Sequence, residues 1–293
     1  MDTAASRAIL YVPEIAFDRP VPTIPAKVFS DERRRAFAPA TPTGFVTLDQ
    51  SEALGSPWPA TTPVLLARYI VLRRGETFTH SLNATAQVYY VIRGAGETRC
   101  GDERFDWAQG DAFCLPGNTE IVQQSQDGAI LLVISNEPEL SYLRASADPE
   151  ATAAIKPTHY RAEDIDRCLS DVHAHTGELK AAGKSVLFLT ELMEQRRVAT
   201  PTIMAAINSL EPGGDQRPHR HSSAALTLAI QGEGVHSMMD GEEIPWEPDT
   251  VIVTPPYVEH SHHNRGSTMM RSFVVQDTGL YTELRSSRFT WTD

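Results

Sequence analysis

Two histidines, His219 and His221, are separated by one residue in the stretch RPHRHSSAALTLAIQGEG. If this stretch is a strand, alternate side chains share a face, so both imidazoles point the same way and can bind one ion. His260, which follows the short β-like run VIV in VTPPYVEHSHHN, supplies a third imidazole from a neighbouring strand. Imidazole ligands suit iron, copper, zinc or nickel, and three protein ligands leave coordination positions open for substrate and for O₂ or water.

Spacing alone does not make a site, because the same His-x-His pattern occurs at His173 and His175 in DVHAHTG. That segment is polar and predicted to be helical, it has no third partner, and we expect both side chains to be exposed. Two further candidates lie beside His260. His262 is either an acid–base group or a solvated loop histidine, and Tyr257 either lines the pocket mouth or is an ordinary turn aromatic.

Short β-like runs punctuated by Gly and Pro form two blocks that must position these histidines. Such runs predict an all-β dominated fold of the sandwich or barrel type. The blocks resemble each other, since Trp107 precedes Pro116 by nine residues, as Trp246 precedes Pro255, and such self-similarity indicates a repeat. The predicted organisation is a Pro-rich N-terminal arm at 1–60, a first barrel at 61–145, a helical or irregular linker at 146–183 and a second, metal-binding barrel at 184–293.

The second block is similar to the cupin superfamily in its His-x-His, its Gly-x-Gly turn, its Pro-containing turn and its distant His. The resemblance covers both blocks and implies two tandem cupin barrels, each a double-stranded β-helix, joined by a short helical linker. Many cupins add a Glu ligand three or four residues after the second His, where this chain has Ala225. The resemblance therefore implies a three-histidine site of the kind found in iron(II) dioxygenases.

Within the cupins, the chain resembles the gentisate and salicylate ring-cleaving dioxygenases. The shared residues are His219-Arg220-His221, Ala225-Leu226, and the run from Thr254-Pro255 through His260, His262 and Asn264. The resemblance implies Fe(II) bound by His219, His221 and His260, with His262 as an acid–base group that titrates near neutral pH. These relatives often place a carboxylate-binding Arg where this chain has Thr227, and a neutral Thr cannot form a charge-assisted pair. Either the substrate lacks that carboxylate or another Arg holds it.

The first block is an internal comparison for the site. In an alignment of the repeats, His80 stands at the first histidine position, Leu82 at the second, Gln87 at the usual Glu position and Ile121 opposite His260. One imidazole and one amide are a poor set of metal ligands. We expect a degenerate, structural barrel, and the alternative is a barrel that binds a small ligand with its inward polar groups.

The overall composition limits the possible partners. A net charge of −12 without a Lys/Arg block argues against nucleic acid, and no stretch approaches the ~18 apolar residues of a membrane span. The N-terminus lacks the pattern of a secretory signal, and the three cysteines form neither a disulfide framework nor a zinc knuckle. We expect a cytoplasmic protein and, by analogy with other cupins, a homo-oligomer.

Together these features predict a mononuclear non-heme iron(II) dioxygenase that cleaves a hydroxylated aromatic ring with O₂. Two alternatives use the same site. A Zn- or Mn-dependent hydrolase or isomerase of a small metabolite would carry water at the open position. A non-catalytic bicupin would bind metal or ligand without turnover.

Overall fold

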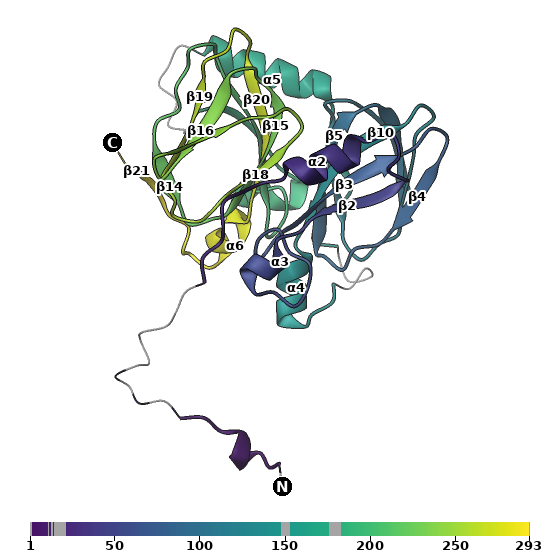
Figure 1. Cartoon of the computed structure of the whole chain (residues 1–293). Coiled ribbons are helices and arrows are strands. Elements are labelled where there is room, and N and C mark those ends of the chain that lie inside the picture. Colours follow the sequence, from purple (N-terminus) through teal and green to yellow (C-terminus); the bar gives the residue numbers. More distant parts are fainter. Residues whose placement is uncertain are drawn as a thin grey trace.

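The computed structural model describes residues 2–10, 12, 14, 22–147, 153–175 and 183–292. Two β-barrels lie side by side in it (Figure 1), and each barrel consists of a large sheet and a small sheet. The predicted all-β dominated architecture with two tandem barrels is confirmed.

The first barrel pairs a six-stranded sheet, of order β11-β8-β5-β10-β3-β2, with a four-stranded sheet, of order β4-β9-β6-β7. Its strands are β2 (Gly44–Leu48), β3 (Leu66–Leu72), β4 (Thr77–His80), β5 (Ala86–Arg93), β6 (Ala95–Cys100), β7 (Glu103–Ala108), β8 (Ala112–Pro116), β9 (Ile121–Gln124), β10 (Ala129–Ser135) and β11 (Thr158–Tyr160).

The second barrel repeats this plan with a six-stranded sheet, of order β1-β18-β15-β20-β13-β12, and a five-stranded sheet, of order β17-β16-β19-β14-β21. Its strands are β1 (Lys27–Val28), β12 (Lys184–Phe188), β13 (Met204–Leu210), β14 (His219–His221), β15 (Ala225–Gln231), β16 (Val235–Met239), β17 (Glu242–Pro245), β18 (Val251–Thr254), β19 (His260–Asn264), β20 (Met270–Gln276) and β21 (Phe289–Trp291).

Short helices connect and cover the sheets, and among the described residues none is long and apolar enough to span a membrane. The helices are η1 (Ala5–Arg7), α2 (Ser30–Phe37), α3 (Ser51–Leu54), α4 (Glu137–Leu143), α5 (Ala162–Ala174), η2 (Glu191–Arg196) and α6 (Thr278–Glu283).

The N-terminal arm and the linker both contribute strands to the barrels. From the arm, β1 pairs with β18 of the second barrel and β2 pairs with β3 of the first. From the linker, β11 pairs with β8 of the first barrel. The predicted boundaries therefore do not coincide with the edges of the sheets, because a two- or three-residue edge strand carries too little pattern to be seen in the sequence. Residues 2–10 lie apart from the barrels (Figure 1), and other parts of the arm and linker lie outside the described residues.

The large sheets of the two barrels face each other across one continuous apolar core. Leu226, Leu228 and Phe273 point out of the second barrel into this core, and Phe273 stacks on Tyr90 of the first barrel at 5.1 Å between ring centroids. The hydroxyl of Tyr69 donates to the backbone oxygen of Asp249 at 2.7 Å. This packing explains why the strands of both large sheets are apolar on both faces. One face of each sheet points into its own barrel, and the other packs against the large sheet of the other barrel.

Helix α5 forms within the predicted linker and carries the second His-x-His pair. His175 is exposed, as expected. The expectation for His173 was wrong, because its Nε2 lies 2.7 Å from Oγ of Ser209 and its Nδ1 lies 3.2 Å from a carboxylate oxygen of Glu211. The two side chains therefore diverge on the helix instead of converging on one point.

Candidate metal centre

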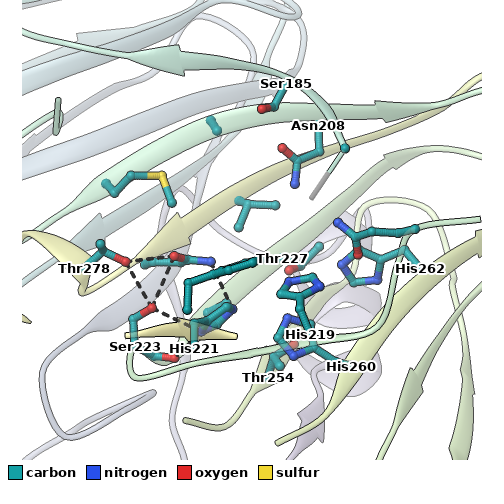
Figure 2. Close-up of a pocket in the computed structure, with 18 of the residues that line it drawn as sticks. Ser185, Asn208, His219, His221, Ser223, Thr227, Thr254, His260, His262 and Thr278 are labelled. Atoms are coloured by element: carbon teal, nitrogen blue, oxygen red, sulfur yellow. Dashed lines mark hydrogen bonds between the residues drawn. The ribbon is translucent and has the colours of Figure 1, made fainter. Parts of the chain in front are cut away.

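Three histidines from two adjacent strands meet inside the second barrel. On β14, His219 and His221 are buried and Arg220 between them is exposed, as strand alternation requires. His260 begins β19 and pairs directly with His219. One nitrogen from each of the three side chains lies within 4.8 Å of the others, and Figure 2 shows the rings grouped on one side of a pocket. We call His219, His221 and His260 the three-histidine set.

Hydrogen bonds to backbone carbonyls determine which nitrogen of each ring carries the proton. Nδ1 of His219 lies 2.9 Å from the carbonyl oxygen of Arg217, Nδ1 of His221 lies 2.8 Å from that of Ser223, and Nδ1 of His260 lies 2.9 Å from that of Val258. A carbonyl oxygen only accepts, so Nδ1 must donate in every case. Each Nε2 therefore presents a lone pair, which is the tautomer and orientation that metal-binding histidines have.

Burial keeps these imidazoles neutral. It lowers the pKa of His221 to about 4 and that of His260 to about 2, and it also lowers the pKa of His219. A neutral imidazole is the form that binds a metal. The donor set therefore fits a divalent metal ion of the kind that nitrogen ligands prefer.

A cavity of about 220 Å³ opens beside the three-histidine set. Its lining includes Ala225, Thr227, His262 and Gln276, and toward its other end lie Ser185 and Asn208 (Figure 2). Ala225 faces the cavity where many cupins have a Glu ligand. With no carboxylate there, the protein ligands that the described residues offer are the three imidazoles.

Large aromatic rings fill the interior of the first barrel. Gln87 pairs with Leu115, the residue before Pro116, as Ala225 pairs with Thr254, the residue before Pro255. The same register places Tyr89 and Phe113 of the first barrel where the second has Thr227 and Ile252. Tyr89 and Phe113 stack at 4.6 Å, whereas Thr and Ile leave room for a ligand.

Polar side chains of the first barrel contact one another, although Nδ1 of His80 is buried without a hydrogen-bond partner among the described residues. His80 pairs with Ile121 as His219 pairs with His260. Its Nε2 lies 3.1 Å from the hydroxyl of Tyr89, which donates to Gln87. Apart from His80, the aligned positions offer no imidazole, and a degenerate, structural barrel stays a prediction.

His262 lies on β19, two residues after His260, and lines the cavity with the three-histidine set. The indole N–H of Trp246 donates to Oγ of Ser237 at 2.8 Å, and that oxygen lies 2.9 Å from Nδ1 of His262. Ser237 accepts from Trp246 and can donate its own proton to Nδ1, an arrangement that favours the N–H of His262 at Nε2. Burial lowers the pKa of His262 to about 3. The lowered pKa favours the neutral imidazole, in which His262 is an N–H donor, and its acid–base role stays a prediction.

The two expected substrate contacts differ in their placement. Thr227 is buried and lines the cavity, as predicted. Tyr257 has an exposed fraction of 56%, is absent from the cavity wall, and adopts a left-handed backbone conformation with φ of 61°. That conformation, rare for a non-glycine residue, brings its backbone N–H to the carbonyl of His221 at 2.8 Å and leaves the ring outside.

Sequence patterns did not reveal three other residues of the cavity wall. Phe289 on β21 stacks on His219 at 4.9 Å, because β21 pairs with β14. Arg288 is the one residue with a charged side chain among the described residues that line the cavity. Gln276 ends β20 with its Nε2 atom 3.3 Å from Nε2 of His221. The sequence does mark Gln276 as a polar residue at the end of the apolar run SFVVQ. Its contact with His221, however, depends on the register of the sheet, which the sequence pattern does not give.

Residues 207–276 match the family described as the cupin domain, and this segment contains the whole three-histidine set. The matched segment lies in the second barrel. Curated relatives match parts of this chain. The 1-hydroxy-2-naphthoate 1,2-dioxygenase of Nocardioides sp. (strain KP7) is 26% identical over 130 residues, which is 44% of this chain and 34% of that protein. The gentisate 1,2-dioxygenase of Streptomyces sp. is 36% identical over 91 residues, which is 31% of this chain and 25% of that protein.

Similarity to a solved structure extends over both barrels. The crystal structure of the salicylate 1,2-dioxygenase from Pseudaminobacter salicylatoxidans superposes with a TM-score of 0.80 at 14% identity, covering 98% of this chain and 94% of that chain. The fold of both barrels is therefore shared with that protein. In sequence, by contrast, the chain spans between 25% and 42% of the length of the curated relatives that it matches.

Proposed function

We propose that the protein is a mononuclear non-heme iron(II) dioxygenase that cleaves a hydroxylated aromatic ring with O₂. The observation that carries this proposal is the three-histidine set, whose neutral Nε2 atoms converge at one wall of a cavity. When bound there, iron(II) would supply positions for a substrate hydroxyl and for O₂ and the electrons that activate O₂. Three neutral ligands preserve the charge of the dipositive ion, which favours a deprotonated phenol.

His262 holds its proton at Nε2 and presents it to the cavity. A neutral N–H donor stabilises negative charge that develops on an oxygen atom without itself releasing the proton. We therefore assign His262 the role of a hydrogen-bond donor to substrate or oxygen. Ser237 and Trp246 position it, since their hydrogen bonds hold the ring in one tautomer.

The size of the cavity favours a substrate with one aromatic ring. An apolar cavity of roughly 150 Å³ in a protein interior accommodates benzene, and this cavity of about 220 Å³ leaves space for a few substituents on such a ring. The lining combines apolar side chains such as Leu187 and Val274 with polar ones such as Thr227. Relatives named for gentisate and salicylate act on single rings, which supports the same choice.

Arg288 at the rim is the group that we assign to an anionic substituent such as a carboxylate. Two hydrogen bonds hold the backbone of Arg288 against Ser222, the residue that follows His221. The backbone N–H of Arg288 donates to Oγ of Ser222 at 3.0 Å, and the backbone N–H of Ser222 donates to the carbonyl of Arg288 at 3.1 Å. This arginine comes from the C-terminal segment, whereas Thr227 occupies the position where relatives often carry one.

The test is metal analysis of protein purified without O₂, followed by O₂ uptake with gentisate, salicylate, catechol and hydroquinone. We expect bound iron and O₂ consumption with a carboxylated single-ring phenol. Arg288→Gln should raise KM for that substrate about tenfold, as loss of a charge-assisted hydrogen bond requires, while Arg285→Gln, three residues earlier and exposed, should not. Firmly bound zinc with turnover in the absence of O₂ would refute the proposal.

A further inference from the structure

Gln276 is the direct cross-strand partner of Ala225. Both residues line the cavity, so both side chains are on the inner face of the large sheet. Ala225 is the position at which many cupins place their carboxylate ligand. The space that a carboxylate would fill beside His221 therefore adjoins a carboxamide from the neighbouring strand.

Hydrogen bonds orient this carboxamide. Its Oε1 accepts from Oγ1 of Thr278 at 2.8 Å and from Oγ of Ser223 at 3.2 Å (Figure 2, dashed lines). Since hydroxyl donors hold the oxygen, the NH₂ group faces the other way, and its Nε2 lies 3.3 Å from Nε2 of His221. Because the proton of His221 is on Nδ1, its Nε2 is the atom that would bind the metal.

We propose that the NH₂ group of Gln276 donates a hydrogen bond to an anionic oxygen or nitrogen ligand bound at the metal position beside His221. This inference rests on the metal centre of the proposed function. When a metal ion binds the Nε2 lone pair of His221, that nitrogen can no longer accept a hydrogen bond from Gln276. The NH₂ group of Gln276 then needs a different acceptor. An anionic ligand of the metal supplies one within the same reach, and an amide left unpaired in a cavity is costly.

The choice of an amide in place of a carboxylate has a chemical consequence. A Glu at this place would neutralise part of the metal's charge and compete with an anionic ligand for the ion. A carboxamide leaves the charge of the ion unchanged and adds a donor to the incoming anion. The arrangement thus favours anionic ligands such as a phenolate over neutral ones.

The first barrel shows the contrasting arrangement. There the glutamine is on the other strand of the pair, as Gln87, opposite Ser135. Its NH₂ group donates to the carbonyl of Pro116 at 3.2 Å, and its Oε1 accepts from Tyr89 at 2.5 Å. One N–H and the Oε1 of Gln87 are thus engaged within the first barrel, whereas in the second barrel the NH₂ group of Gln276 lies against Nε2 of His221.

The experiment uses the full chain loaded with cobalt(II), with azide as the anionic probe. Cobalt affinity is measured by competition with a chelator, and azide affinity by the change in visible absorption. Gln276→Met keeps the length of the side chain and removes the donor, so it should weaken azide binding about tenfold while changing cobalt affinity less than twofold. Thr278→Val, which removes one anchor of the carboxamide, should weaken azide binding in the same direction. Gln231→Met, at an exposed position on β15, is the matched control and should bind azide like the wild type.

Gln276→Glu supplies the opposite change. It should raise cobalt affinity and weaken azide binding, because a carboxylate ligand then replaces the neutral donor. Wild-type azide affinity in both Gln276→Met and Thr278→Val would overturn the proposal. A loss of cobalt affinity in Gln276→Met would also overturn it, since Gln276 would then be a metal ligand through its oxygen. Neither readout requires turnover, so a negative O₂-uptake screen would refute the proposed function without altering this result.

Discussion

The hydroxyl oxygen of Ser237 lies 2.9 Å from Nδ1 of His262, and the indole of Trp246 donates to the same oxygen. These two hydrogen bonds favour the tautomer of His262 in which the proton is on Nε2, the nitrogen that faces the cavity. Ser237→Ala should therefore lower kcat/KM about tenfold, the effect of losing about one hydrogen bond to the positioned ring. Iron content should stay at the wild-type level, because Ser237 touches no residue of the three-histidine set.

The first barrel offers a matched control for that variant. The indole of Trp107 donates to Oγ1 of Thr98 at 2.9 Å, in the same arrangement but far from any candidate ligand. Thr98→Ala should leave kcat/KM unchanged. Equal losses in both variants would show that the serine stabilises the barrel and does not position His262.

His262 should contribute no ionisation to the pH profile between pH 5 and pH 8. Burial lowers its pKa to about 3, so its neutral form is present throughout this range. His262→Gln keeps a neutral N–H donor and should retain more activity than His262→Ala, which we expect to lose at least about tenfold. A limb near pH 6.5 in the wild-type profile of kcat/KM that disappears in His262→Gln would contradict this assignment.

Phe273 joins the two barrels through its stack on Tyr90 and is fully buried. Phe273→Ala should lower the free energy of unfolding by about 3–5 kcal/mol, the usual cost of removing a buried phenylalanine ring. Urea unfolding followed by circular dichroism measures this change. Leu284→Ala, at a position with an exposed fraction of 64%, should change it by less than about 0.5 kcal/mol. Similar values for the two variants would argue against a shared core.

Asp277 should make the protein less stable as the pH rises from 4 to 7. Burial raises the pKa of its carboxyl to about 7 in the folded chain, above the ordinary value of 3.8. The folded state therefore binds more protons than the unfolded state in this window, so stability falls until both states are ionised above pH 7. Asp277→Asn keeps an oxygen acceptor for the N–H of Ala224 and should flatten this dependence. Denaturant midpoints at pH 4, 5.5, 7 and 8 check it, with exposed Asp171→Asn as the control, and an unchanged slope in Asp277→Asn would refute the assignment.

The grouping of the three histidines could be predicted from the sequence because it depends on local rules. Strand alternation places His219 and His221 on one face, and the repeated turn pattern brings His260 to the adjacent strand. Both are confirmed by the geometry. Alternation along β15 likewise places Thr227 inside the barrel.

Other parts of the site depend on pairing between distant segments. Gln276 meets His221 only because β20 pairs with β15 in one register, and Arg288 reaches the cavity rim only because β21 adds to β14. The tautomer of His262 depends on Ser237, which is 25 residues away in the sequence. Tyr257 was misplaced for a local reason, since nothing in its neighbours signals a positive φ.

The central claim is that His219, His221 and His260 bind the iron on which ring cleavage depends. Its most direct test is the iron content and O₂ uptake of His219→Ala, purified without O₂ beside the wild type and beside His175→Ala from the other His-x-His pair. The account predicts about one iron per chain and O₂ uptake in the wild type and in His175→Ala, and neither in His219→Ala. Full iron content and activity in His219→Ala would contradict it.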